Sequence, residues 1–237
     1  MLLLKTIGLL FSISAFSVTN PSDLWPKSAK LNTEIGNFSV KIETDSFKKI
    51  MKSKEDLIAK YFWSKERDHF ICVINSVCSI LMSKIRILSG IPFNKFIKKY
   101  KLVEKINGWH KYRDKTGTED YSDISLKYEK DILSLIQKKP TGTEYINFSF
   151  ENDKYGKVLK SVEHKSFVGL QKFKTVTTIE YGDNLKLRLP KKIKMITNQS
   201  LITNDTKTTK RKIAETYQFT DYIINNKSNL EQLKLSK

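Results

Sequence analysis

The sequence predicts an α+β fold in which a curved antiparallel sheet, an incomplete β-barrel, carries two or three helices over its concave face. Several runs alternate apolar and polar residues, which is the period of a strand with one buried face. Residues 76–104 instead have apolar side chains at helical spacing. Because no repeat or linker divides the chain, residues 31–225 are expected to form a single domain.

In the first part of this domain, the sequence pattern predicts a strand, a helix and a hairpin, in that order. The run 37–43 alternates between apolar and polar side chains. A Thr-Asp pair then provides a cap for a helix over residues 44–57. Two β-rich runs, 58–63 and 69–74, flank a charged turn and predict a hairpin.

Two further helices are expected within residues 76–104. The apolar residues of 80–88 fit one helical face, which ends at Gly90. Pro92 is suited to the first turn of the next helix, which carries aromatic residues as far as Tyr100.

The second half of the chain is predicted to consist mostly of strands. They are expected at 124–128, 146–150, 158–162, 172–181, 184–189 and 213–219. Three other segments break this pattern: a short helix at 132–135, a polar, threonine-rich loop at 198–211 and a polar tail at 226–237. The prediction for the whole chain is about eight to ten strands.

Residues 1–17 have the layout of a secretory signal peptide. A single lysine precedes an apolar stretch that is too short to span a bilayer, and Ala15 and Ser17 place small side chains before a cleavage site. An uncleaved anchor or a buried N-terminal helix is the alternative. With cleavage, residues 18–30 form a leader segment and the protein is exported, either periplasmic or secreted. No later run is long enough to cross a membrane.

The chain is strongly basic, with 43 Lys and Arg against 25 Asp and Glu and a formal net charge of +18. Such an excess attracts polyanions, namely nucleic acid, anionic membrane surfaces or acidic headgroups. No nucleic-acid partner is expected for an exported protein, which leaves an anionic membrane surface as a candidate partner. The lysines are spread along the chain, so a solvated basic surface without a partner is the alternative.

Cys72 and Cys78 are the two cysteines of the chain. An oxidising compartment permits a disulfide between them, while their apolar neighbours equally fit two buried thiols. Their spacing, with only His69 close in sequence, is poor for a metal site.

No motif for catalysis, a cofactor or a metal ion is found, and the protein is expected not to be an enzyme. The three histidines are far apart, and the chain lacks nucleophile elbows, phosphate-binding loops and dinucleotide fingerprints. The acidic residues between Asp114 and Asp123 do not form a calcium loop, because Ser125 stands where the twelfth-position Glu is needed. A secreted hydrolase whose active site is assembled from distant residues is the remaining enzyme hypothesis.

Apolar side chains gather on one predicted face of the sheet. If the helical cover leaves part of this face unfilled, the space is an apolar cavity that can hold acyl chains; an ordinary filled core is the alternative. The candidate lining residues are Phe38, Val40, Ile42, Phe62, Trp63, Ile71, Val73, Phe148, Phe150, Phe173, Leu187, Tyr217 and Phe219.

In order along the chain, these features resemble the periplasmic lipoprotein-carrier superfamily of LolA-like proteins. The early strand 37–42 is followed by the strand–turn–strand run 61–71, and 189–195 precedes a last strand that ends at 219–225. Residues 76–110 depart from the pattern because they contain more helix. The resemblance implies an incomplete barrel over helices and a role in lipoprotein sorting towards the outer membrane.

The leading hypothesis is therefore a non-enzymatic exported protein that binds lipid or lipoprotein acyl chains in an apolar cavity. The alternative is an envelope structural or interaction protein with a solid core and no ligand.

Overall fold

A computed structural model describes residues 21–29, 34–44, 59–64, 68–71, 100–114, 123–139, 142–204 and 207–235. These residues form one 12-stranded antiparallel sheet, one α-helix and short 3-10 helices. The elements are η1 (Pro21–Leu24), η2 (Lys27–Ala29), β1 (Asn37–Thr44), β2 (Ala59–Ser64), β3 (Asp68–Ile71), β4 (Tyr100–Ile106), β5 (Trp109–Asp114), β6 (Ile124–Glu129), β7 (Ile132–Lys139), β8 (Gly142–Asp153), β9 (Gly156–Val168), β10 (Gln171–Tyr181), η3 (Leu185–Leu187), β11 (Pro190–Asn204), β12 (Lys207–Ile224) and α4 (Lys227–Leu235).

The strand order is β3-β2-β1-β12-β11-β10-β9-β8-β7-β6-β5-β4. Every neighbouring pair except β1–β12 is also consecutive in sequence, so most of the sheet is a meander of hairpins. The β1–β12 pair brings the two ends of the domain together. Within the described residues, β3 and β4 are the two free edges, and the sheet is open.

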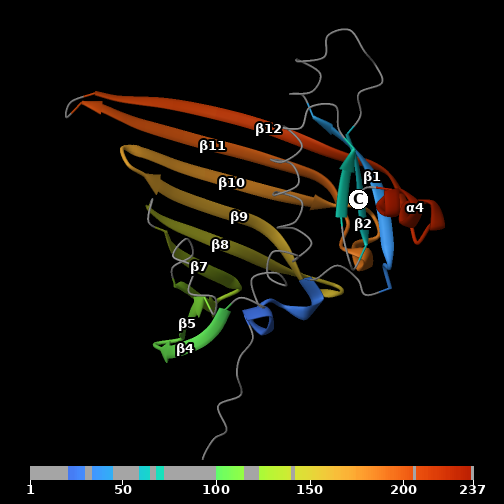
Figure 1. Cartoon of the computed structure of the whole chain (residues 1–237), viewed down its shortest axis with the longest axis horizontal. Coiled ribbons are helices and arrows are strands. Elements are labelled where there is room, and N and C mark those ends of the chain that lie inside the picture. The colour runs from blue at the N-terminus through green and yellow to red at the C-terminus, as the bar shows by residue number, and fades with distance from the viewer. Residues whose placement is uncertain are drawn as a thin grey trace, which may run out of the picture.

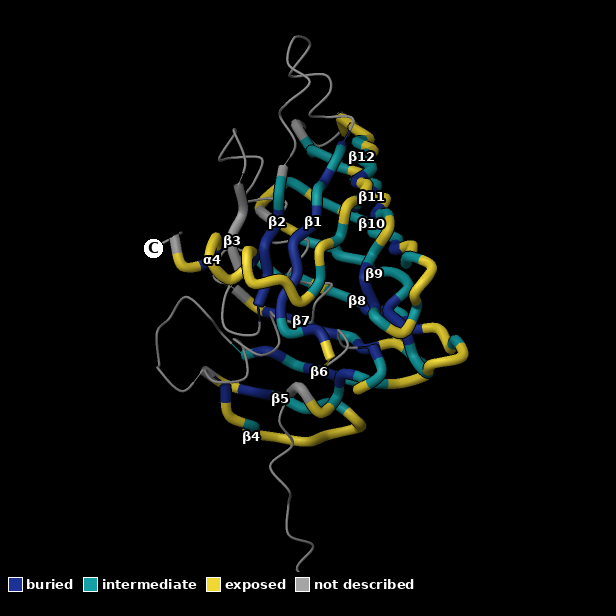
Figure 2. The backbone as a smooth tube through the Cα atoms, turned by 90° about the vertical axis from the view of Figure 1, so that its right-hand side faces the viewer, coloured by how far each residue is buried: buried dark blue, intermediate teal, exposed yellow. Residues whose placement is uncertain are grey.

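The sheet is strongly curved, as the sequence predicts. Strands β8 to β12 run side by side, while β1 and β2, which follow β12 in the strand order, are steeply inclined to them on the right of Figure 1. Burial follows this shape: β1 and β2 are largely buried, whereas most of β4 is exposed along its free edge (Figure 2).

A β-bulge in β12 keeps one face of that strand apolar along its length. Tyr217 and Phe219 share a face with Ile42 of β1. Asp221 then adopts a φ of 52°, and the register shifts by one residue. Without the bulge, Tyr222 and Ile224 would point to the face opposite Tyr217 and Phe219, because adjacent strand residues alternate. With it, they pack on the same face as Tyr217.

The expectation of two or three helices over the concave face is not supported. The one α-helix in the described part of the chain is α4, and it lies in the segment predicted to be a polar tail. Asn229 of α4 donates hydrogen bonds to Asn37 Oδ1 at 3.0 Å and to the Ile223 carbonyl at 2.9 Å. Because Asn37 alternates with Phe38, α4 packs on the opposite face from Phe38.

The expected helix at 44–57 and most of the helical block at 76–104 lie outside the described residues, although 100–104 belong to β4. The predicted hairpin of the early domain is confirmed by the pairing of β2 with β3.

Three predictions in the second half of the chain are wrong. Residues 132–135 form the start of β7 rather than a short helix. The predicted loop at 198–211 is the outer part of the β11–β12 hairpin. Residues 185–187 form η3 rather than a strand, and η3 ends at Arg188 with a φ of 58°. Tertiary contacts override the alternating leucines of this last segment, because the buried Arg188 side chain binds Asp153 and the Ser28 carbonyl.

Candidate functional site: the inner face of the sheet

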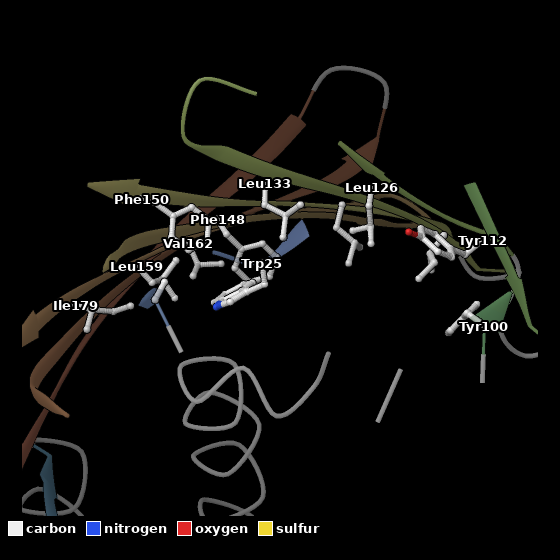
Figure 3. Close-up of a cluster of buried hydrophobic side chains, with 13 residues drawn as sticks. Trp25, Tyr100, Tyr112, Leu126, Leu133, Phe148, Phe150, Leu159, Val162 and Ile179 are labelled. Atoms are coloured by element: carbon white, nitrogen blue, oxygen red, sulfur yellow. The ribbon is translucent and has the colours of Figure 1, made fainter. Parts of the chain in front are cut away.

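The concave side of the sheet, here called the inner face, carries two apolar clusters. The β1 cluster is centred on β1, β2, β11 and β12, and the Trp25 cluster on β5 to β10 (Figure 3). Ile179 of the Trp25 cluster and Ile193 of the β1 cluster are direct cross-strand partners. Since partners in register point to the same side, the two clusters form one continuous apolar strip.

Eight of the candidate lining residues lie in this strip. They are Phe38, Val40, Ile42, Trp63, Tyr217 and Phe219 in the β1 cluster, and Phe148 and Phe150 in the Trp25 cluster. All eight are buried. Aromatic contacts organise the β1 cluster, where the Phe38 ring is stacked on Trp63 and meets Tyr61 edge-on.

The other candidates are placed differently. Phe62 is buried on the opposite face, because it alternates with Tyr61 and Trp63 along β2, and Lys60 Nζ lies over its ring. Leu187 is in η3 and packs at the margin of the β1 cluster, and Phe173 is only half-buried. The side chains of Ile71 and Val73, and the pair Cys72 and Cys78, lie outside the described part.

Trp25 is the central residue that the sequence analysis did not place in the core. It belongs to the segment expected to be a leader, yet its side chain is 1% exposed. Its ring meets Phe148 and Phe150 edge-on, with centroid distances of 5.2 and 5.1 Å (Figure 3). The N-terminal segment therefore packs on the inner face of β6 to β9.

Polar contacts hold this segment at the end of the sheet. The Ser28 hydroxyl accepts a hydrogen bond from the Lys157 backbone N–H at 2.8 Å, and Arg188 Nε donates to the Ser28 carbonyl at 2.9 Å. Arg188 is buried and also forms a bidentate pair with Asp153. These hydrogen bonds lower the pKa of the Asp153 carboxyl below its usual range.

Towards the β9–β10 and β11–β12 turns, the inner face becomes polar. Thr175 and Thr197 are cross-strand partners whose hydroxyls are 3.0 Å apart. Next to them, His164 pairs with Thr175 in register, and its Nε2 is 3.8 Å from a carboxylate oxygen of Glu144. The inner face is thus amphipathic along the strands, with an apolar half and a polar half.

Tyr217 lies at the boundary between the two halves. Its hydroxyl donates a hydrogen bond of 2.7 Å to Glu215, which points to the same face two residues earlier. Burial and this hydrogen bond raise the pKa of the Tyr217 phenol above its usual range. The phenol therefore stays neutral and directs its proton to the carboxylate.

Within the described residues, no group of His, Cys, Asp and Glu side chains is arranged to hold a metal ion. Asp123, the last of the acidic residues that lack the pattern of a calcium loop, is paired with Arg113 and Lys111. The hydrogen bond from Arg113 lowers the pKa of Asp123. The His164–Glu144 distance is too long for a hydrogen bond and makes an ion pair only when the imidazole is protonated.

None of the helices in the described ranges is both long and apolar enough to cross a membrane. Comparison of the chain with protein-family models, with curated proteins and with solved structures finds no match in any of the three.

Proposed function

We propose that this protein is a non-enzymatic, exported binding protein for lipids or for the acyl chains of a lipidated partner, in the manner of LolA-like carriers. The observation that carries the proposal is the division of the inner face. An apolar strip runs from β1 to β5, and a polar region adjoins it at His164, Thr175 and Thr197. That division matches an amphiphile with a hydrocarbon chain and a polar end.

The hydrophobic contribution is sufficient without specific polar contacts. Each methylene group transferred from water to an apolar environment contributes about 0.8 kcal/mol. A chain of roughly ten methylene groups therefore contributes about 8 kcal/mol before the cost of immobilising it is subtracted. The neighbouring threonines, His164 and Glu144 then provide donors and acceptors for the polar end of the ligand.

The packing of Trp25 favours a second candidate function, a structural or interaction protein with a solid core. The indole already contacts Phe148 and Phe150 in the middle of the apolar strip. On this alternative, the N-terminal segment completes the core and the inner face takes no ligand. The two candidates differ in whether the native protein has a saturable site for an apolar probe.

Adjacent residues of β10 provide a matched pair of variants for this test. Thr177 lies on the inner face with Val162 and Met195 as cross-strand partners. Thr178 points to the opposite face, beside Ser161 and Lys194. Thr177→Trp fills space on the inner face, whereas Thr178→Trp adds the same side chain outside it.

The probe is the fluorescent fatty acid cis-parinaric acid, titrated into each folded variant. We expect saturable binding by the parent protein and by Thr178→Trp, and a loss of about tenfold or more in affinity for Thr177→Trp. Absence of saturable binding to the parent protein, or equal affinity of both variants, contradicts the proposal. Native mass spectrometry of protein purified from its own host compartment then identifies the bound lipid.

A further inference from the structure

The end of the sheet formed by the β9–β10 and β11–β12 turns exposes apolar side chains among lysines. Leu170, in the β9–β10 turn, is 62% exposed, and Phe167 and Tyr145 are each 40% exposed. The two aromatic rings contact each other edge-on at 6.1 Å. The Leu170 carbonyl accepts a hydrogen bond from the N–H of Ile202 in β11, so the β9–β10 turn lies against the outer part of the longer β11–β12 hairpin (Figure 1).

Each exposed ring lies directly across the strand pair from a lysine. Tyr145 of β8 pairs with Lys165 of β9, and Phe167 pairs with Lys172 of β10. We call this end, with Leu170, Tyr145, Phe167, Lys165 and Lys172, the basic tip. Farther along, β12 adds the exposed cations Lys210, Arg211 and Lys212.

Acidic residues are scarce around the basic tip. No Asp or Glu occurs in the sequence between residues 164 and 179, nor between 184 and 204, where Asp205 is the next acid. Glu144, which precedes Tyr145, lies beside His164 on the inner face. Glu163, the nearest acid on the outer face, is already bound by Lys165 and Lys174, each at 2.7 Å. Lys172 forms no ion pair within the described part of the chain, so its positive charge is not compensated there.

Several cations at the opposite end of the sheet are paired with carboxylates. Lys157 pairs there with Asp131, Arg188 with Asp153 and Lys192 with Glu180. Each of these three cations therefore faces a carboxylate, whereas Lys172 of the basic tip does not.

We infer that the basic tip docks onto an anionic lipid bilayer, with Leu170, Phe167 and Tyr145 entering the interfacial region and the surrounding lysines contacting lipid headgroups. Aromatic rings are favoured at the membrane interface, and basic residues near an anionic surface add to the attraction. Lysines also extend their charged ends to the headgroups while their stems stay apolar.

A nucleic acid is the other polyanion that a basic surface can attract. The exposed leucine at the apex favours lipid, because an aliphatic side chain offers neither a stacking surface nor a hydrogen bond to a base. This inference concerns the outer end of the sheet and does not depend on ligand binding at the inner face.

The test is co-sedimentation of the purified full chain with vesicles of phosphatidylcholine alone or mixed with phosphatidylglycerol. We expect binding to the mixed vesicles that weakens with salt. Leu170→Ser and Lys172→Glu should each weaken it by about tenfold. The matched controls lie at the opposite end: Ile106→Ser replaces an isoleucine that is 55% exposed, and Lys191→Glu reverses an exposed lysine.

Controls that weaken binding as much as the basic-tip variants would overturn the proposal, because general charge would then explain the attraction. Binding of the parent protein to a DNA oligonucleotide but not to vesicles would overturn it in favour of a nucleic-acid site. Thr177→Trp should bind the mixed vesicles like the parent protein, which separates this result from that of the fatty-acid titration. Circular dichroism establishes that each variant is folded.

Discussion

Replacing Trp25 with alanine removes the side chain that fills the middle of the inner face. The indole is almost completely buried and makes edge-on contacts with both Phe148 and Phe150. Truncation of a buried Trp or Phe to Ala typically costs about 3–5 kcal/mol, which includes the cavity that remains. Each aromatic pair contributes about 0.5–1.5 kcal/mol beyond its buried area. We therefore expect the free energy of unfolding to fall by about 3–5 kcal/mol.

For a domain of this size, that loss corresponds to a decrease of roughly 6–20 °C in Tm. The assay is urea unfolding followed by circular dichroism, with Tyr155→Ala as the control. Tyr155 is an aromatic residue in the β8–β9 turn and is 43% exposed, so its truncation should change stability by less than about 0.5 kcal/mol. If Trp25→Ala is no more destabilised than Tyr155→Ala, the N-terminal segment does not contribute to the core as described.

Two further predictions concern the contacts that hold the N-terminal segment. Arg188 lowers the pKa of the Asp153 carboxyl in the folded protein below its ordinary value of 3.8. As pH falls, this carboxyl is therefore protonated in the unfolded chain before it is protonated in the folded protein. The ion pair stabilises the fold fully above pH 3.8, and this stabilisation is lost as pH falls through the lower pKa of the folded protein. Asp153→Asn should therefore show a flatter decline of stability below about pH 5 than the parent protein, and an identical decline would contradict this role. Gly156→Ala should cost more than about 2 kcal/mol, because its φ is 101° and a Cβ would lie 2.9 Å from Ser28 Cβ. Gly169→Ala, at a φ of 55° with open space around its Cβ, should cost only about 1 kcal/mol in the same urea titration, and equal losses would refute the contact with Ser28.

Alternation along the chain was enough to predict the early strand and several later ones. Phe38, Val40 and Ile42 are buried on one face of β1, as their spacing indicates. The same rule separates Phe62 from Trp63, because adjacent residues in a strand point to opposite faces. Including both in one lining was therefore inconsistent with the predicted strand.

The segments that sequence reasoning misassigned lack a clear periodic signal. Residues 198–211 belong to a hairpin whose two faces are both at least partly exposed, so they show no apolar alternation. Residues 132–135 carry apolar side chains at three of four positions, with Ser134 between Leu133 and Leu135, and so short a run does not distinguish helix from strand. In the structure Leu133 and Leu135 are buried on the same side of β7.

Two other features depend on contacts between distant residues. The helix α4 has few apolar residues and is held on the sheet by Asn229, which donates a hydrogen bond to Asn37, 192 residues away. Trp25 packs on Phe148 and Phe150, and its segment is held there by Ser28, which accepts a hydrogen bond from the Lys157 N–H, and by Arg188, 160 residues from Ser28. A Trp within an otherwise polar leader is the one sequence signal that could have indicated its burial.

The central claim is that an acyl chain binds on the inner face, and fluorescence quenching by 9,10-dibromostearic acid tests it most directly. Trp63 is buried in the β1 cluster, whereas Trp109 is on the opposite face from Tyr112 and His110 in β5. Two single-tryptophan variants, with the other tryptophans changed to Phe, report on each position separately. The account predicts saturable quenching of Trp63 and none of Trp109; equal quenching of both, or none of Trp63, would contradict it.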